Sequence, residues 1–76
     1  MVEEITNYIH EEIDVLVNQE EELLSSGLID SITIMKLIAH LEERYEIKVP
    51  PQDMVIENFN SVLSITEYIA QQQKNR

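Results

Sequence analysis

Hydrophobic residues recur at helical spacing along most of the chain. Gaps of three and four residues predict a first amphipathic helix over residues 2–17. Its apolar stripe is formed by Val2, Ile5, Ile9, Ile13 and Leu16. A run without an apolar face and the only glycine, Gly27, follow this helix, so we expect a long first connection over roughly residues 18–30. The residues that can fill the space beneath this connection are Leu23, Leu24, Leu28 and Ile29.

A second helix is predicted to begin at Asp30 and Ser31. An aspartate at the N-cap can accept a hydrogen bond from the backbone N–H of Thr33, and its charge suits a helix N-terminus. The helix is expected to end near Tyr45, because Pro50-Pro51 prevents much further extension.

The last third of the chain predicts two more helical segments. One or two short helical turns are expected over residues 52–57, and Asn60 or Ser61 is expected to cap a last helix. That helix should run to Ile69, and residues 70–76 should form a frayed tail. The prediction is therefore an all-α fold: a small antiparallel four-helix bundle, with three long helices, a short third helix and a long first loop.

Length and charge narrow the classes of function. The 76 residues form one domain, residues 1–76, in which 15 acidic residues outnumber 5 basic ones for a net charge of −10. This charge argues against nucleic acid or an anionic membrane surface as the main partner, and it favours basic partner proteins and a monomer. No cysteine is present, which excludes thiolate metal sites and thiol nucleophiles and fits a reducing compartment. With an acidic start and no apolar run of about 20 residues, we expect a cytoplasmic protein without membrane insertion.

No set of catalytic or metal-binding residues is recognisable. The two histidines, His10 and His40, occupy polar helical positions and are expected to be solvated. The acidic run Glu20-Glu21-Glu22 lacks the spacing of a calcium-binding loop. The sequence therefore predicts neither an enzyme nor a metal site.

The second helix carries more apolar surface than one core stripe requires. Its core stripe consists of Ile34, Leu37, Ile38, Leu41 and Tyr45. A second apolar patch lies near the opposite side, formed by Ile32, Met35 and Ala39 beside Lys36 and Glu43. Because a surface helix needs only one apolar stripe, this patch favours contact with a partner. The alternative is that the short helix covers it.

Ser31 stands at the start of this helix, between Asp30 and Ile32. Its local sequence alone favours a helix-capping serine. No histidine is nearby in sequence to activate it, so an intrinsic nucleophile is not supported. A serine modified by another enzyme needs only exposure, local mobility and a docking surface beside it.

The segment Gly27-Leu28-Ile29-Asp30-Ser31-Ile32 resembles the phosphopantetheine attachment segment of acyl and peptidyl carrier proteins. The resemblance continues through residues 41–50 and through Glu57-Asn58-Phe59-Asn60-Ser61-Val62, so it covers essentially the whole chain. It implies a four-helix bundle with a short third helix. It also implies that a phosphopantetheinyl transferase, using coenzyme A and magnesium, attaches 4′-phosphopantetheine to Ser31 through a phosphodiester.

The resemblance further implies a function and a set of partners. Acyl or aminoacyl groups would be loaded by a ligase as thioesters on the thiol of the arm, and delivered to a downstream acyltransferase or synthase. The second helix is the main recognition element of such carriers. The residues that it would present to partners are Asp30, Ile32, Met35, Lys36, Ala39 and Glu43.

Two positions separate this chain from housekeeping fatty-acid carriers. Those carriers have acidic residues two and five positions after the serine, where this chain has Thr33 and Lys36. The segment over residues 50–68 looks more like stand-alone carriers that serve dedicated adenylating ligases, including D-alanyl carriers. We therefore expect a specialised carrier. The alternatives are a fatty-acid synthase carrier and an acidic helical adaptor that carries no prosthetic group.

Overall fold

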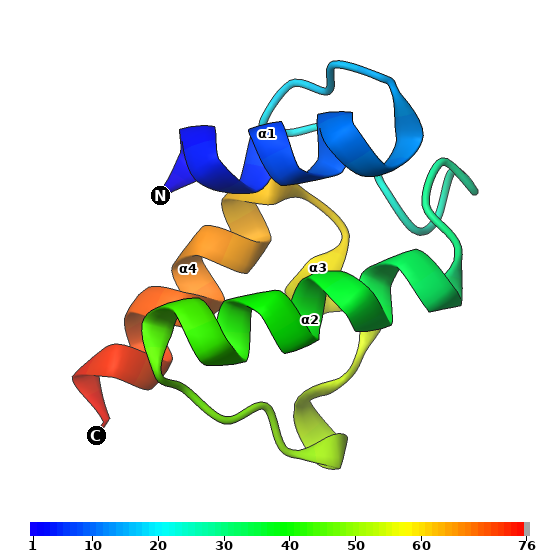
Figure 1. Ribbon diagram of the computed structural model, residues 1–76. Helices are drawn as coiled ribbons and strands as arrows, with labels where there is room; N and C mark the ends of the chain where they lie inside the picture. The colour runs from blue at the N-terminus through cyan, green and yellow to red at the C-terminus, as the bar shows by residue number, and fades with distance from the viewer. Residues whose placement is uncertain (76) are drawn as a thin grey trace.

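The computed structural model describes residues 1–75 and shows an all-helical fold (Figure 1). Its elements are α1 (Val2–Ile13), α2 (Ser31–Tyr45), the 3-10 turn η1 (Pro51–Asp53), α3 (Ile56–Phe59) and α4 (Val62–Lys74). α1 and α2 run in opposite directions, and α4 crosses behind them at a steep angle (Figure 1). The all-α class, the short third helix and the bounds predicted for the second helix are confirmed.

One hydrophobic core holds these elements together. α4 packs against α1 and α3, and α1 also packs against α2. The buried residues of the four helices are Ile5, Ile9, Ile34, Leu37, Ile38, Leu41, Phe59, Val62, Ile65 and Ile69. The connections add Val17, Leu23, Ile29, Ile47 and Val49 to the core. Burial of these apolar side chains, rather than helix propensity, is the main source of stability in helices this short.

The first helix begins at Val2 as predicted but is shorter than the hydrophobic pattern predicts, so the expected end at residue 17 is wrong. α1 ends at Ile13 because Asp14 adopts a left-handed conformation, with φ of 58°, and donates its backbone N–H to the His10 carbonyl. The first connection therefore covers residues 14–30, and within it Val17 enters the core while Leu16 remains 74% exposed. The apolar spacing continued past the helix end because Val17 still has to be buried.

The other differences lie in the last third of the chain. The one or two helical turns expected over residues 52–57 are two separate turns with shifted bounds: η1 ends at Asp53, and α3 starts at Ile56 because Val55 is extended. The hydroxyl of Tyr68 in α4 donates to Asp53 Oδ2 at 2.7 Å, which fixes η1 against α4. Ser61 caps α4 as predicted, and α4 continues to Lys74, so residues 70–74 of the expected tail are helical in this structure. Of the predicted tail, Arg76 lies outside the described residues.

The end of α2 provides a stability prediction. Glu46 caps α2 with φ of 54°, a left-handed conformation that an L-residue adopts at a cost of about 1–2 kcal/mol and glycine does not. We expect Glu46→Gly to raise the free energy of unfolding by about 1 kcal/mol, because glycine's greater freedom in the unfolded chain offsets part of the gain. Glu43→Gly, the same change inside the helix, should lower it by about 1 kcal/mol. Thermal melting of both variants measures the two changes in the free energy of unfolding. Changes of the same sign would contradict the left-handed conformation of Glu46.

Candidate functional site

Ser31 is the first residue of α2 and is exposed to solvent. The helix cap is supplied by its neighbour: Asp30 Oδ1 accepts the backbone N–H of Thr33 at 2.8 Å. This hydrogen bond is the main cause that lowers the pKa of the Asp30 carboxyl, so the cap is ionised near neutral pH. Because Asp30 caps the helix, the Ser31 hydroxyl is not required for that role. The structure therefore does not support the capping interpretation of this serine.

An apolar hollow of about 500 Å³ lies directly beside Ser31. Three segments form its walls: the end of the first connection, one side of α2, and the chain from η1 into α3. Ile34, Ile38 and Phe59 are its buried lining, whereas Met35 and Ile56 are exposed at its rim. A serine, a helix N-terminus and an apolar depression thus meet at one point of the surface.

The second apolar patch of α2 is exposed, as predicted. Ile32 is 69% exposed and Met35 is 52% exposed, and neither is covered by α3. Ala39, Lys36 and Glu43 are exposed as well. At 100° per residue these five positions fall within about 100° of arc, so they share one face of α2. The short helix approaches only Met35, with which Ile56 shares the hollow, and it leaves most of the patch exposed.

The exposed apolar surface continues beyond α2 onto residues that the sequence reasoning missed. Met54, Val55 and Ile56 are 39%, 41% and 53% exposed, and all three line the hollow from the side opposite α2. The run Met54-Val55-Ile56 is visible in the sequence. Its exposure was not predictable, because in a helical turn this short no periodicity separates a buried face from an exposed one. These three residues, together with Ile32 and Met35, are called the apolar docking face below.

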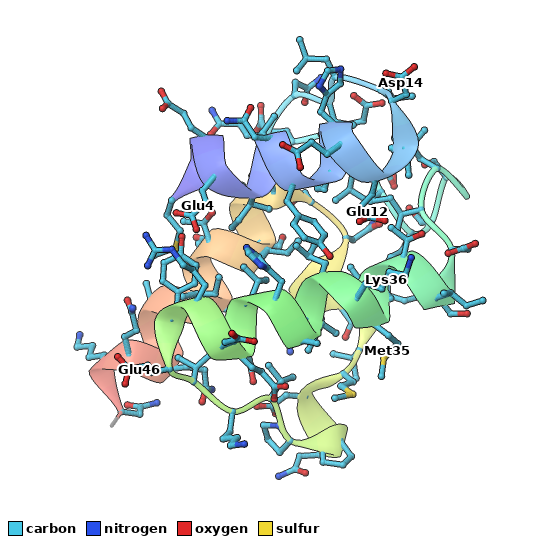
Figure 2. The ribbon with its side chains drawn as sticks, viewed as in Figure 1. Glu4, Glu12, Asp14, Met35, Lys36 and Glu46 are labelled. Atoms are coloured by element: carbon cyan, nitrogen blue, oxygen red, sulfur yellow. The ribbon has the colours of Figure 1, made fainter. Side chains whose placement is uncertain are left out.

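Ion pairs between α1 and α2 define the other border of this face. Lys36 Nζ lies 3.7 Å from Glu12 Oε2, and Arg44 Nε lies 2.8 Å from Glu4 Oε2. Figure 2 shows Lys36 and Glu12 facing one another between the two helices, while Met35 extends from the other side of α2. The Lys36 side chain remains 59% exposed, so its charge is accessible despite the pair.

The remaining candidates for chemistry lie apart from Ser31. His10 is exposed on α1, as predicted, and approaches Asp14 at 4.0 Å. The prediction for His40 is only partly correct: its ring is half-buried and stacks on Tyr8, with ring centroids 4.6 Å apart. Over residues 1–75 there is no cluster of side chains suited to hold a metal ion. No helix in that range is both long and apolar enough to cross a membrane.

Comparison with known proteins identifies the family. Residues 1–69 match the family described as "Phosphopantetheine attachment site". The D-alanyl carrier protein of Streptococcus uberis is 37% identical over 60 residues, which are 79% of this chain and 76% of that protein. The D-alanyl carrier protein of Streptococcus pyogenes serotype M5 is 32% identical over the same shares of both chains. That of Streptococcus sanguinis is 31% identical over 76% of this chain and 73% of its own.

The site fits the prosthetic group of this family. A phosphodiester on Ser31 would stand at the N-terminus of a 15-residue helix, where backbone N–H groups and the helix dipole favour negative charge. The apolar hollow beside it leaves room for the start of an arm without displacing any core residue. When bound, the group supplies a thiol that a chain without cysteine does not have. The chain belongs to the phosphopantetheine-binding carrier proteins, which carry a covalently attached 4′-phosphopantetheine and are not enzymes.

Proposed function

We propose that Ser31 is the residue to which 4′-phosphopantetheine is attached, and that the protein carries acyl or aminoacyl groups as thioesters on that arm. The observation that carries this proposal is the position of Ser31. It is exposed and is the first residue of α2, and its hydroxyl is not needed as a cap because Asp30 caps the helix. An attachment serine needs an accessible hydroxyl on a rigid element, with a surface beside it on which enzymes can dock. The N-terminus of α2 and the apolar docking face supply both.

The chain's own residues act by presentation. The hydrogen bond from Thr33 to Asp30 fixes the first turn of α2, so the serine is held on an ordered backbone. The apolar docking face offers a contact that excludes water, and the acidic surface around it attracts basic partner surfaces and speeds encounter. In this proposal the helical bundle with its long first connection is the scaffold. Asp30, Ile32, Met35, Lys36, Ala39 and Glu43 are the contact residues on it.

The cargo that the comparisons favour is D-alanine. The similar proteins from three streptococci are D-alanyl carrier proteins, and they align with more than three quarters of this chain. We therefore propose a specialised carrier that is loaded in the cytoplasm, as a monomer, by a dedicated adenylating ligase. A phosphopantetheinyl transferase would precede the ligase, and an acyltransferase would consume the loaded carrier.

Loading of the modified protein tests the cargo. The carrier is first converted with coenzyme A, magnesium and a broad-specificity phosphopantetheinyl transferase, and conversion is checked by intact-protein mass. It is then incubated with ATP, D-alanine and a D-alanine-activating ligase. We expect a mass gain of one D-alanyl group that neutral hydroxylamine removes, because a thioester is cleaved under these conditions. L-alanine is the matched control. Preferential loading of a fatty acid by an acyl ligase would favour the fatty-acid carrier instead.

Charge placed in the apolar docking face should impair modification without harming the fold. We expect Ile32→Glu to raise the KM of the transferase for the carrier by about tenfold or more, since a carboxylate would have to lose water in the contact. The free energy of unfolding, measured by thermal melting, should change by no more than about 0.5 kcal/mol, because Ile32 is 69% exposed. Leu16→Glu is the matched control, placed at a 74% exposed position on the first connection. Equal KM values for the two variants would place the contact elsewhere.

A further inference from the structure

Asn60 lies where three parts of the fold meet. It follows Phe59 at the end of α3 and precedes Ser61, the N-cap of α4. The first connection passes against it, although 35 or more residues separate the two in sequence. The cap of α4 is made by Ser61 Oγ, which accepts the backbone N–H of Ser64 at 3.0 Å. Asn60 is therefore not needed to start α4, and its side chain serves another purpose.

The backbone carbonyl and both polar side-chain atoms of Asn60 bind three consecutive residues of the first connection. Its backbone carbonyl accepts the N–H of Leu23 at 2.6 Å. Its side-chain Oδ1 accepts the backbone N–H of Leu24 at 2.8 Å and that of Ser25 at 3.0 Å. Its Nδ2 donates to Ser25 Oγ at 3.1 Å. One carboxamide thus satisfies two consecutive backbone donors and one hydroxyl, which uses both lone pairs of Oδ1 and one of the two Nδ2 donors.

The same contacts connect Asn60 to the Ser31 site. The carbonyl of Leu23 accepts the N–H of Ile29 at 2.9 Å, so the segment that Asn60 holds also holds the residue two positions before Ser31. Leu24 and Ile29 line the hollow on the side of the connection, and Phe59 lines it on the side of α3. Asn60 therefore joins two of the three walls of the hollow beside the serine.

We propose that Asn60 is a positioning residue for the Ser31 site. Its carboxamide fixes the first connection against the end of α3. The segment that leads into α2 and the two walls of the hollow that Asn60 joins therefore keep their relative positions when an enzyme docks. The proposal rests on the function proposed for Ser31. Without the carboxamide, the core still forms around Leu23 and Phe59, but the backbone N–H groups of Leu24 and Ser25 lose their acceptor and have only water as a partner. A docking enzyme would then have to order this segment, which weakens binding rather than the chemical step.

Two substitutions at the same position isolate the role of Oδ1. Asn60→Leu keeps the size of the side chain and removes its acceptor, whereas Asn60→Asp keeps an acceptor for the N–H groups of Leu24 and Ser25. We expect Asn60→Leu to speed hydrogen exchange at the amides of Leu24 and Ser25 about tenfold or more, while core amides of α4 change much less. The KM of the transferase for this variant should rise about fivefold with kcat nearly unchanged. Asn60→Asp should restore both quantities to near their original values.

A third variant separates positioning from a general loss of stability. Ile69→Val, in the core of α4 and away from the hollow, should lower the melting temperature without changing the KM. If Asn60→Leu does not melt cooperatively, Asn60→Ser, which is too short to reach both N–H groups, takes its place in the same comparison.

The two proposals can fail separately. The positioning role would be overturned if the amides of Leu24 and Ser25 exchanged as slowly in Asn60→Leu as in the unsubstituted protein. Exchange that accelerates equally in α1, α2 and α4 would overturn it too. The role would also be overturned if Asn60→Leu showed fast exchange at these amides but the KM of the transferase for it were unchanged. Absence of any transfer to the unsubstituted protein would instead contradict the function of Ser31, whereas the exchange data would still report whether Asn60 holds the connection.

Discussion

Ser31→Ala is expected to abolish attachment of 4′-phosphopantetheine completely. The phosphodiester forms on the serine oxygen, and alanine has none, so the mass gain expected for the unsubstituted protein with coenzyme A, magnesium and the transferase should be absent. The fold should be unaffected, because Asp30 supplies the cap of α2 and Ser31 is exposed. We expect the free energy of unfolding to change by no more than about 0.5 kcal/mol, since alanine is also a good helix former. Intact-protein mass and thermal melting measure the two effects.

Ser26→Ala is the matched control for this experiment. Ser26 is another exposed serine, five residues earlier, whose hydroxyl binds the Glu22 carbonyl within the first connection. This variant should accept the prosthetic group as the unsubstituted protein does. Attachment to Ser31→Ala would show that another hydroxyl is the acceptor. Loss of attachment in Ser26→Ala, with its fold intact, would mean that the connection and not only the serine decides recognition.

The second helix could be predicted from the sequence in detail. An aspartate cap, a core stripe and two following prolines define α2, and the structure places both of its ends where these signals predict. The spare apolar patch of Ile32 and Met35 was also predictable, because the periodicity of a 15-residue helix separates two faces clearly. Local signals sufficed here because each of them acts within a few residues.

The rest of the site depends on contacts between distant segments, which no local pattern contains. The rim residues Met54 and Ile56 follow η1, whose place against α4 is fixed by the hydrogen bond between Asp53 and Tyr68, 15 residues apart. The hydrogen bonds of Asn60 span 35 and 36 residues. In the sequence Asn60 resembled only a possible cap, since that interpretation needs no knowledge of where the first connection lies. Tertiary contacts therefore complete a site whose centre is set locally.

Leu23 and Leu16 both lie in the first connection, but the same change to alanine is expected to cost far more stability at Leu23, where it gives the largest expected effect on stability. Leu23 is fully buried, although it lies outside any helix, whereas Leu16 is 74% exposed. We expect Leu23→Ala to lower the free energy of unfolding by about 3 kcal/mol, because it removes buried methyl groups and leaves a cavity. In a domain of this size that loss corresponds to a fall of about 15 °C in the melting temperature. Leu16→Ala should change the free energy of unfolding by no more than about 0.5 kcal/mol.

The comparison also distinguishes two descriptions of the connection. If it were a flexible loop laid over a finished core, Leu23→Ala would cost little more than Leu16→Ala, because the loop could close over the missing side chain. The structure instead places Leu23 in the core and fixes its N–H and carbonyl to Asn60 and Ile29, at 2.6 and 2.9 Å. With its backbone held on both sides, the segment has little freedom to collapse into the cavity, which places the loss well within the range for buried leucines. Thermal melts with equal losses for the two leucines would contradict this arrangement, and with it the rigid support that the Ser31 site requires.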